Sequence, residues 1–152
     1  EGYNAVWTTD SDGIRTSSTA WMTDAQTAAH ANGYENIFSK DFNNDGLISG
    51  GQYYQLLGDN GPVTLRSHSG ANGFNDDSSS SSNVVAAKNN SSSFQVLFDG
   101  TGSVEGYNAV WTTDSDGIRT SSTNWMTDAQ ATSAGYESVF NIDLNNNGLI
   151  GS

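Results

Sequence analysis

Two short segments rich in Asp, Asn and Gly have the residue types and the spacing of a calcium-binding loop. The first loop, "DFNNDGLISG", begins at residue 41, and the second loop, "DLNNNGLIGS", begins at residue 143. Calcium loops place side-chain oxygens at positions one, three and five, a glycine at six for a sharp turn, and a backbone carbonyl at seven. Both segments follow this pattern, so we expect both to bind Ca²⁺. The expected ligands are Asp41, Asn43, Asp45 and Leu47 in the first loop and Asp143, Asn145, Asn147 and Leu149 in the second.

The two loops differ in the number of charged ligands that they offer. Position twelve of the first loop is Gln52, where an EF-hand has a bidentate Glu, and the second loop has Asn147 where the first has Asp45. Because fewer anionic ligands weaken binding, we expect Ca²⁺ dissociation constants on the order of 10⁻⁴ to 10⁻³ M, as in extracellular modules. The alternative is that Asn and Gly form only turns in these segments.

The sequence that leads to each loop is itself repeated. Residues 1–26 reappear as residues 105–130 with a single change, from Ala20 to Asn124. Self-similarity of this kind indicates the unit of folding. The predicted domains are residues 1–50, the C-terminal half of one repeat ending in a calcium loop, and residues 51–152, a complete second repeat.

The complete repeat carries the patterns of strands, hairpin turns and short helices. Alternating apolar residues predict strands, Asp-Gly predicts a hairpin turn, and apolar residues at helical spacing predict helices. The Ser- and Asn-rich residues 67–93 predict a solvated loop, within which residues 84–87 are compatible with one or two helical turns. The predicted order is strand–turn–strand at 52–67, the polar loop, a strand at 93–100, a hairpin at 107–121, and one or two short helices at 125–140.

This order of elements predicts an α+β fold that is mostly β. We expect a tandem repeat of small antiparallel-sheet domains, each with a short helix leading into an EF-hand-like calcium loop. The helix before the first loop is expected to direct Tyr34, Ile37 and Phe38 into the core.

The composition excludes several classes of function. The net charge of −12 argues against nucleic-acid binding, because contacts with phosphate need concentrated positive charge. The chain has no apolar run of membrane-spanning length, so no membrane insertion is expected. His30 and His68 lack a nearby nucleophile motif, and Asp76 and Asp77 lie in a Ser-rich run. We therefore do not expect an enzyme.

Three segments together resemble a known family: "SFQVLFDGTGSVEGYNAVWTTDSDGI", "NWMTDAQ" and "GYESVFNIDLNNNGLIG". The chain resembles the tryptophan-rich repeat domain found toward the C-terminus of large bacterial surface and secreted proteins, many of them cyanobacterial. One departure is near Asn83, where family members tend to carry a Trp. The loops also resemble the calcium loop of dockerins. Dockerins pair two such loops close together, whereas these lie 102 residues apart, so cohesin binding is not expected.

The resemblance implies an extracellular or cell-surface location and supplies no catalytic residues. We expect a structural or adhesive repeat module that Ca²⁺ rigidifies at the repeat junctions, with neighbouring repeats or identical subunits as partners. Because the chain begins at Glu1 rather than Met, we expect it to be an excerpt of a longer or processed protein. The alternative is a carbohydrate-binding adhesion domain that stacks sugars on exposed Trp and Tyr side chains; large aromatic residues also build small cores. The tryptophans concerned are Trp7, Trp21, Trp111 and Trp125.

Overall fold

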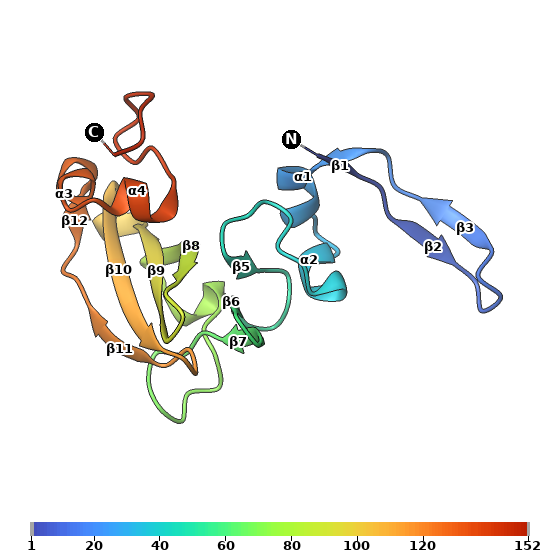
Figure 1. Ribbon diagram of the computed structural model, residues 1–152, viewed down its shortest axis with the longest axis horizontal. Coiled ribbons are helices and arrows are strands. Elements are labelled where there is room, and N and C mark those ends of the chain that lie inside the picture. Colours follow the sequence, from blue (N-terminus) through green and yellow to red (C-terminus); the bar gives the residue numbers. More distant parts are fainter. Residues whose placement is uncertain (1, 152) are drawn as a thin grey trace.

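The computed structural model describes residues 2–151, which form an elongated molecule with an antiparallel sheet at one end and a narrow hairpin at the other (Figure 1). The sheet has the strand order β11-β10-β9-β8, and the short strand β12 pairs with the start of β10. In β9, Phe94, Val96 and Phe98 face one side of the sheet and Leu97 faces the other. The strands are β8 (Ser82–Asn89), β9 (Ser93–Gly100), β10 (Tyr107–Asp114), β11 (Arg119–Ser122) and β12 (Met126–Thr127).

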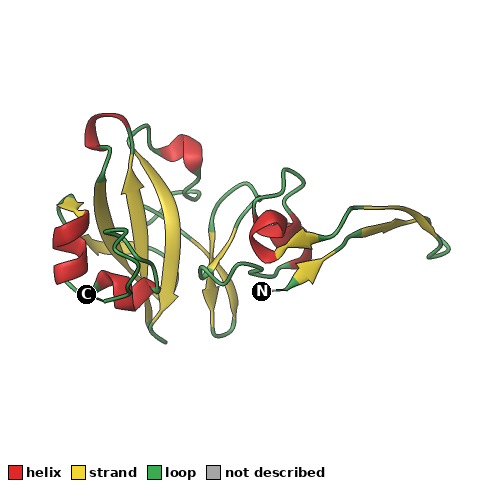
Figure 2. Cartoon of the chain, turned by 90° about the horizontal axis from the view of Figure 1, so that it is seen from above, coloured by secondary structure: helices red, strands yellow, loops and turns green. Residues whose placement is uncertain are grey.

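A different part of the chain covers each face of this sheet (Figure 2). On one face, Phe98 belongs to a cluster with Leu56 and Leu65, from the region of the three-stranded sheet β5-β6-β7. On the other face, Leu97 and Val110 pack with side chains of the last helix. The central strands are therefore buried on both sides, and both of their faces contribute to the core. The covering elements are β5 (Leu47–Ile48), β6 (Gln55–Gly58), β7 (Gly61–Thr64), α3 (Asp128–Ser133) and α4 (Tyr136–Phe140).

The N-terminal part of the described chain consists of two separate strand pairs and two short helices. β1 pairs with β4, and β2 pairs with β3 to form the hairpin that projects to the right in Figure 1. A capping box between Thr23 and Gln26 begins the first helix, because each side chain satisfies a backbone N–H of the other. The elements are β1 (Tyr3–Asn4), β2 (Trp7–Thr9), β3 (Arg15–Ser18), β4 (Met22–Thr23), α1 (Asp24–Ala28) and α2 (Tyr34–Phe38); two 3₁₀ turns, η1 (Asp76–Ser78) and η2 (Gly102–Val104), lie farther along the chain.

The predicted fold class, a tandem repeat of small antiparallel-sheet domains with EF-hand-like loops, is wrong. Residues 2–151 form one small, mostly β domain with four short helices. The sequence repeats but the sheet does not, because β9 has two edges and both are occupied, by β8 and β10. The first copy of the repeat therefore forms only two-stranded pairs.

The expected EF-hand geometry is also absent from the described residues. An EF-hand has a helix on each side of its calcium loop. The first loop follows α2, but it leads into the two-residue strand β5. The second loop follows α4, and no helix comes after it up to Gly151.

Part of the region predicted as a polar loop, residues 67–93, is the edge strand β8. Residues 84–87 are therefore extended and not helical. Val84 and Ala86 are buried on opposite faces of the sheet. The strand is stabilised by its pairing with β9. The Ser-rich residues on either side of it made the segment resemble a polar loop in the sequence.

The helix before the first loop is oriented differently from the prediction. Tyr34 is buried as expected, but Ile37 and Phe38 are 60% and 52% exposed. Glu35 is fully buried instead. In the described part of the chain, no helix combines the length and the apolar character needed to cross a membrane.

Candidate metal centre

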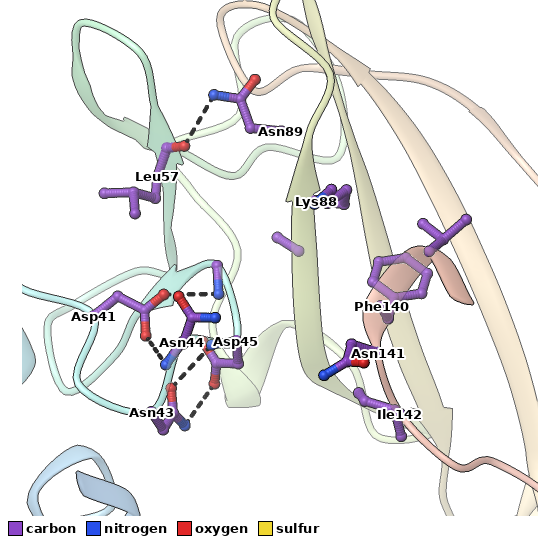
Figure 3. Close-up of a pocket in the computed structure, with 13 residues that line it drawn as sticks. Asp41, Asn43, Asn44, Asp45, Leu57, Lys88, Asn89, Phe140, Asn141 and Ile142 are labelled. Atoms are coloured by element: carbon purple, nitrogen blue, oxygen red, sulfur yellow. Dashed lines mark hydrogen bonds between the residues drawn. The ribbon is translucent and has the colours of Figure 1, made fainter. Parts of the chain in front are cut away.

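The first loop is wound around its own Asp and Asn side chains (Figure 3). Asp41 Oδ2 accepts a hydrogen bond from the N–H of Gly46 at 2.8 Å. Asn43 Oδ1 accepts one from the N–H of Asp45 at 3.2 Å, and Asp45 Oδ1 accepts one from Leu47 at 2.8 Å. The three expected side-chain ligands are thus gathered within one turn of chain, and Gly46 permits that turn with a φ of 83°.

The second loop repeats this network at the equivalent positions. Asp143 Oδ2 accepts a hydrogen bond from the N–H of Gly148 at 2.7 Å. Asn145 Oδ1 accepts one from Asn147 at 3.1 Å, and Asn147 Oδ1 accepts one from Leu149 at 2.8 Å. Asn147 therefore makes the same backbone contact as Asp45 without its charge. The loop geometry is a property of the motif, since it forms in two different surroundings.

A buried glutamate on the preceding helix holds both ends of each loop. Glu35 Oε1 accepts a hydrogen bond from the N–H of Phe42 at 3.0 Å. Its Oε2 accepts one from the N–H of Ser49 at 3.0 Å and one from the Ser49 hydroxyl at 2.7 Å. The carboxylate replaces the backbone partners that the loop lacks, so the loop closes on itself.

Glu137 has the same role in the second loop. Its Oε1 accepts a hydrogen bond from the N–H of Leu144 at 3.0 Å, and its Oε2 accepts one from Gly151 at 2.8 Å. Burial opposes the charge of Glu137, but hydrogen bonds from Thr132 and from backbone N–H groups outweigh this effect and lower its pKa.

Neither glutamate was predicted as a functional residue from the sequence, because a Glu on a short helix is typical of a solvated position. The available signal was the recurrence of Glu six residues before each loop.

The charge distribution of the first loop favours a cation. Burial raises the pKa of the Asp45 carboxyl to about 6, and the charges of Asp41 and Glu35 add to this rise. Hydrogen bonds from Asn43 and the Leu47 N–H act in the opposite direction. No three Asp, Glu, His or Cys side chains converge as metal ligands in the described part of the chain. A cation in this loop would therefore rely on amide and carbonyl oxygens as well as carboxylates, as in calcium loops.

The first loop also connects the N-terminal part of the chain to the central sheet. The N–H of Ala87 in β8 donates to the carbonyl of Asp45 at 2.7 Å, and the N–H of Leu57 in β6 donates to that of Gly46 at 3.1 Å. We call this contact the seam. A cleft of about 400 Å³ lies beside it, and Figure 3 shows Phe140 and Ile142 across the cleft from the loop.

The second loop is more exposed than the first. An added side-chain carbon at Gly148 would meet open space, whereas at Gly46 it would collide with the Ala87 carbonyl. Leu149 and Ile150 are 61% and 46% exposed, although their counterparts in β5 are each 2% exposed.

The family model described as "Tryptophan-rich Synechocystis species C-terminal domain" matches residues 47–151. This chain belongs to that family. The tryptophan-rich domain thus starts at β5, in the last part of the first loop, and continues through the second loop. No curated protein and no solved structure matches the chain.

The four tryptophans occupy different environments in and beside the tryptophan-rich domain. Trp111 packs against Phe98 and Phe74, with ring centroids 4.4 and 5.2 Å apart. Trp7, the same residue in the first copy, is 63% exposed. Trp21 and its counterpart Trp125 are 73% and 36% exposed. One tryptophan therefore serves the core, and the other three present indole surface to solvent.

Proposed function

We propose that this chain is a structural or adhesive module of an extracellular or cell-surface bacterial protein, in which Ca²⁺ in the first loop fixes the seam. The observation that carries the proposal is the double use of this loop. Its main chain is hydrogen-bonded to β6 and β8, while its side chains offer oxygens at calcium-loop spacing. Neighbouring copies of the domain or identical subunits are the proposed partners.

The donor set of each loop fits a hard cation, because it contains oxygens and neither nitrogen nor sulfur. The proposed ligands are Asp41, Asn43, Asp45 and the Leu47 carbonyl in a dockerin-like first loop, and Asp143, Asn145, Asn147 and the Leu149 carbonyl in the second. The second loop has one carboxylate fewer, so it binds more weakly. The positive charge of a bound ion would offset the negative charges of Asp41 and Asp45.

Stiffening of the seam follows from the charge of these carboxylates. Without a cation, burial opposes the charge of Asp45 and raises its pKa, and the nearby charges of Asp41 and Glu35 add to this rise. Ca²⁺ would offset these charges and stabilise the loop conformation that positions the carbonyls of Asp45 and Gly46 on the sheet. Removal of the ion is expected to loosen the N-terminal part of the chain relative to the tryptophan-rich domain.

Thermal unfolding of the intact chain tests this proposal. With the affinity expected above, about 10 mM Ca²⁺ stabilises the protein over a chelator by about 1–3 kcal/mol, which raises Tm by about 3–8 °C. Asp41→Asn should remove most of this gain. The matched variant Asp143→Asn should retain most of it, because the second loop has one carboxylate fewer and binds Ca²⁺ more weakly. Equal Tm values in Ca²⁺ and in chelator would overturn the proposal.

Carbohydrate binding is the second candidate, and the exposure of Trp21 favours it. The indole is 73% exposed, and the equivalent Trp125 remains partly exposed in the second copy. An exposed indole face suits stacking against a sugar ring. A glycan array with the intact chain tests this function: binding should be lost in Trp21→Ala and kept in Trp111→Phe. The absence of any retained glycan would eliminate this candidate.

A further inference from the structure

The first copy of the repeat exposes side chains whose identical counterparts are buried. Thr113 in β10 is 1% exposed, whereas Thr9 in β2 is exposed. Val110 is 2% exposed, whereas its counterpart Val6 is only half-buried. Trp7 shows the same contrast with the core residue Trp111. Because the sequences are the same, the difference lies in what covers them.

The first copy already has the strand pairs and the side-chain hydrogen bond that the second copy has in the sheet. Trp7 pairs with Ser18 just as Trp111 pairs with Ser122, and both hairpins have a bulge at the same place. Outside the hairpin, the side-chain hydrogen bond from Asn4 to Asp24 is 2.8 Å long, and its counterpart in the second copy is 2.7 Å long. These pairings are therefore formed before the first copy meets a partner of the kind that covers β10, and only residues 5–6, which separate β1 from β2, have to join them into one strand.

That partner in the second copy is the hairpin of β8 and β9. β9 forms a continuous antiparallel ladder with β10, from Asn108 opposite Asp99 to Asp114 opposite Ser93. Phe98 of β9 covers the ring of Trp111. Both edges of β9 are occupied within the molecule, so its own β9 is not available to the first copy.

The first copy also has a cleft where the second has a side chain. The cleft is about 430 Å³, is open to solvent, and lies between Ala5 and Val6 on one side and Phe38 and Phe42 on the other. In the second copy, the counterparts of Val6, Phe38 and Phe42 are Val110, Phe140 and Leu144, and all three belong to the apolar cluster that contains Leu97 of β9. A β9-type strand would thus place a Leu in this cleft and Phe and Val side chains on Trp7.

We propose that residues 3–9 are an acceptor site for the β8–β9 hairpin of another tryptophan-rich domain. The incoming strand pairs antiparallel with β1 and β2, on the edge opposite β3 and β4, and buries Val6 and Trp7. The recognition elements are the backbone N–H and C=O groups of that edge and the alternating apolar side chains of the strand. The site needs no metal ion, so it is independent of the Ca²⁺ proposal.

Binding of a synthetic peptide with the sequence of residues 82–100 to the intact chain, in chelator, tests the proposal. Amide hydrogen exchange is the measurement. Proteolytic fragments that reach Ala20 or Asn124 differ in mass, so they distinguish the two otherwise identical copies. We expect amide protection across residues 3–9 to rise at least tenfold, with no loss of protection in β10.

Three variants make the test specific. A peptide with Phe98→Asp should not bind, because that side chain would be placed on Trp7. In the receptor, Val6→Glu should weaken binding at least tenfold, and Asp12→Asn, at the exposed hairpin turn, should leave it unchanged. Two outcomes would overturn the proposal. If amide protection rises nowhere, the peptide does not bind. If protection changes only in the fragments of the second copy, the peptide exchanges with the β8–β9 hairpin in the central sheet.

Discussion

The two copies of the repeated sequence, residues 2–26 and 106–130, have the same local structure in different surroundings. Each forms a short strand pair and a bulged hairpin with the same register, and each begins its helix with a Thr–Gln capping box. Only the second copy lies against β9, which buries Val110 and Thr113. Turns and caps are set by residues nearby in sequence, whereas burial is set by a strand that the hairpin does not contain.

The largest expected effect comes from removing the equivalent indole in each copy. Trp111 packs against Phe74 and Phe98, whereas Trp7 is 63% exposed. We expect Trp111→Ala to lower the free energy of unfolding by about 3 kcal/mol and Trp7→Ala to lower it by less than about 1 kcal/mol. Urea unfolding followed by circular dichroism measures both values. Equal losses would mean that the first copy is also buried in solution, and the contrast between the copies would disappear.

The buried glutamates extend the comparison to the two loops. Glu35→Gln places an amide NH₂ against backbone donors, and the first loop carries Leu47, which is 2% exposed, into the core. We expect this variant to lose about 2 kcal/mol of unfolding free energy, because a buried donor is left unsatisfied.

Glu137→Gln breaks the same contacts in a loop whose Leu149 is 61% exposed. Its effect should therefore be local, as faster amide exchange across residues 144–151, with a smaller change in global stability. Urea unfolding and hydrogen exchange on both variants separate the two outcomes. A larger global loss in Glu137→Gln than in Glu35→Gln would contradict the assignment of the seam to the first loop.

These contrasts show which features could be predicted from the sequence. The Asp-Gly hairpin turns and the strand at 93–100 depend on local residue types, and both are present. The gathering of Asp41, Asn43 and Asp45 within one loop follows from the same local spacing. Whether that loop binds Ca²⁺ remains a prediction.

The missed features depend on contacts between distant residues. β8 was hidden because Val84 and Ala86 are buried only through pairing with β9. The role of Glu35 was hidden because its partners include Ser49, fourteen residues away. The tandem-repeat fold class was wrong because one β9 strand cannot serve two copies of the repeat, a limit that appears only once the strands are paired.

A smaller effect on stability, one that depends on pH, is expected at Asp45, whose counterpart in the second loop is the uncharged Asn147. The pKa of Asp45 in the folded protein is about 6, above the ordinary value of 3.8. The folded state therefore binds this proton more tightly than the unfolded state does, and the resulting stability is present below about pH 4 and lost as the pH rises through 6. In chelator at pH 7, we expect Asp45→Asn to be more stable than the unmodified chain by about 1–2 kcal/mol.

The same variant should behave differently at low pH and with Ca²⁺. At pH 4 the stability difference should vanish, because Asp45 is then protonated and uncharged. In Ca²⁺ at pH 7 its sign should reverse, because a ligand has been lost. Chemical unfolding at the two pH values, with chelator and with Ca²⁺, measures all of these differences. A variant less stable than the parent in chelator at pH 7 would show that the Asn43 and Leu47 hydrogen bonds outweigh burial of the charge.

The smallest effect is expected from the one residue that distinguishes the copies. Ala20 and Asn124 are both exposed. If β9 sets burial, then the double change Ala20→Asn and Asn124→Ala should alter the free energy of unfolding by less than about 0.5 kcal/mol and leave the exposure of Trp7 and Trp111 unchanged. Acrylamide quenching, with each indole removed in turn by substitution with Phe, measures that exposure. A swap that exchanged the quenching of the two indoles would place the cause at position 20. Since every other residue of the copies is identical, an unchanged result leaves the presence of β9 beside β10 as the cause of the burial of Trp111.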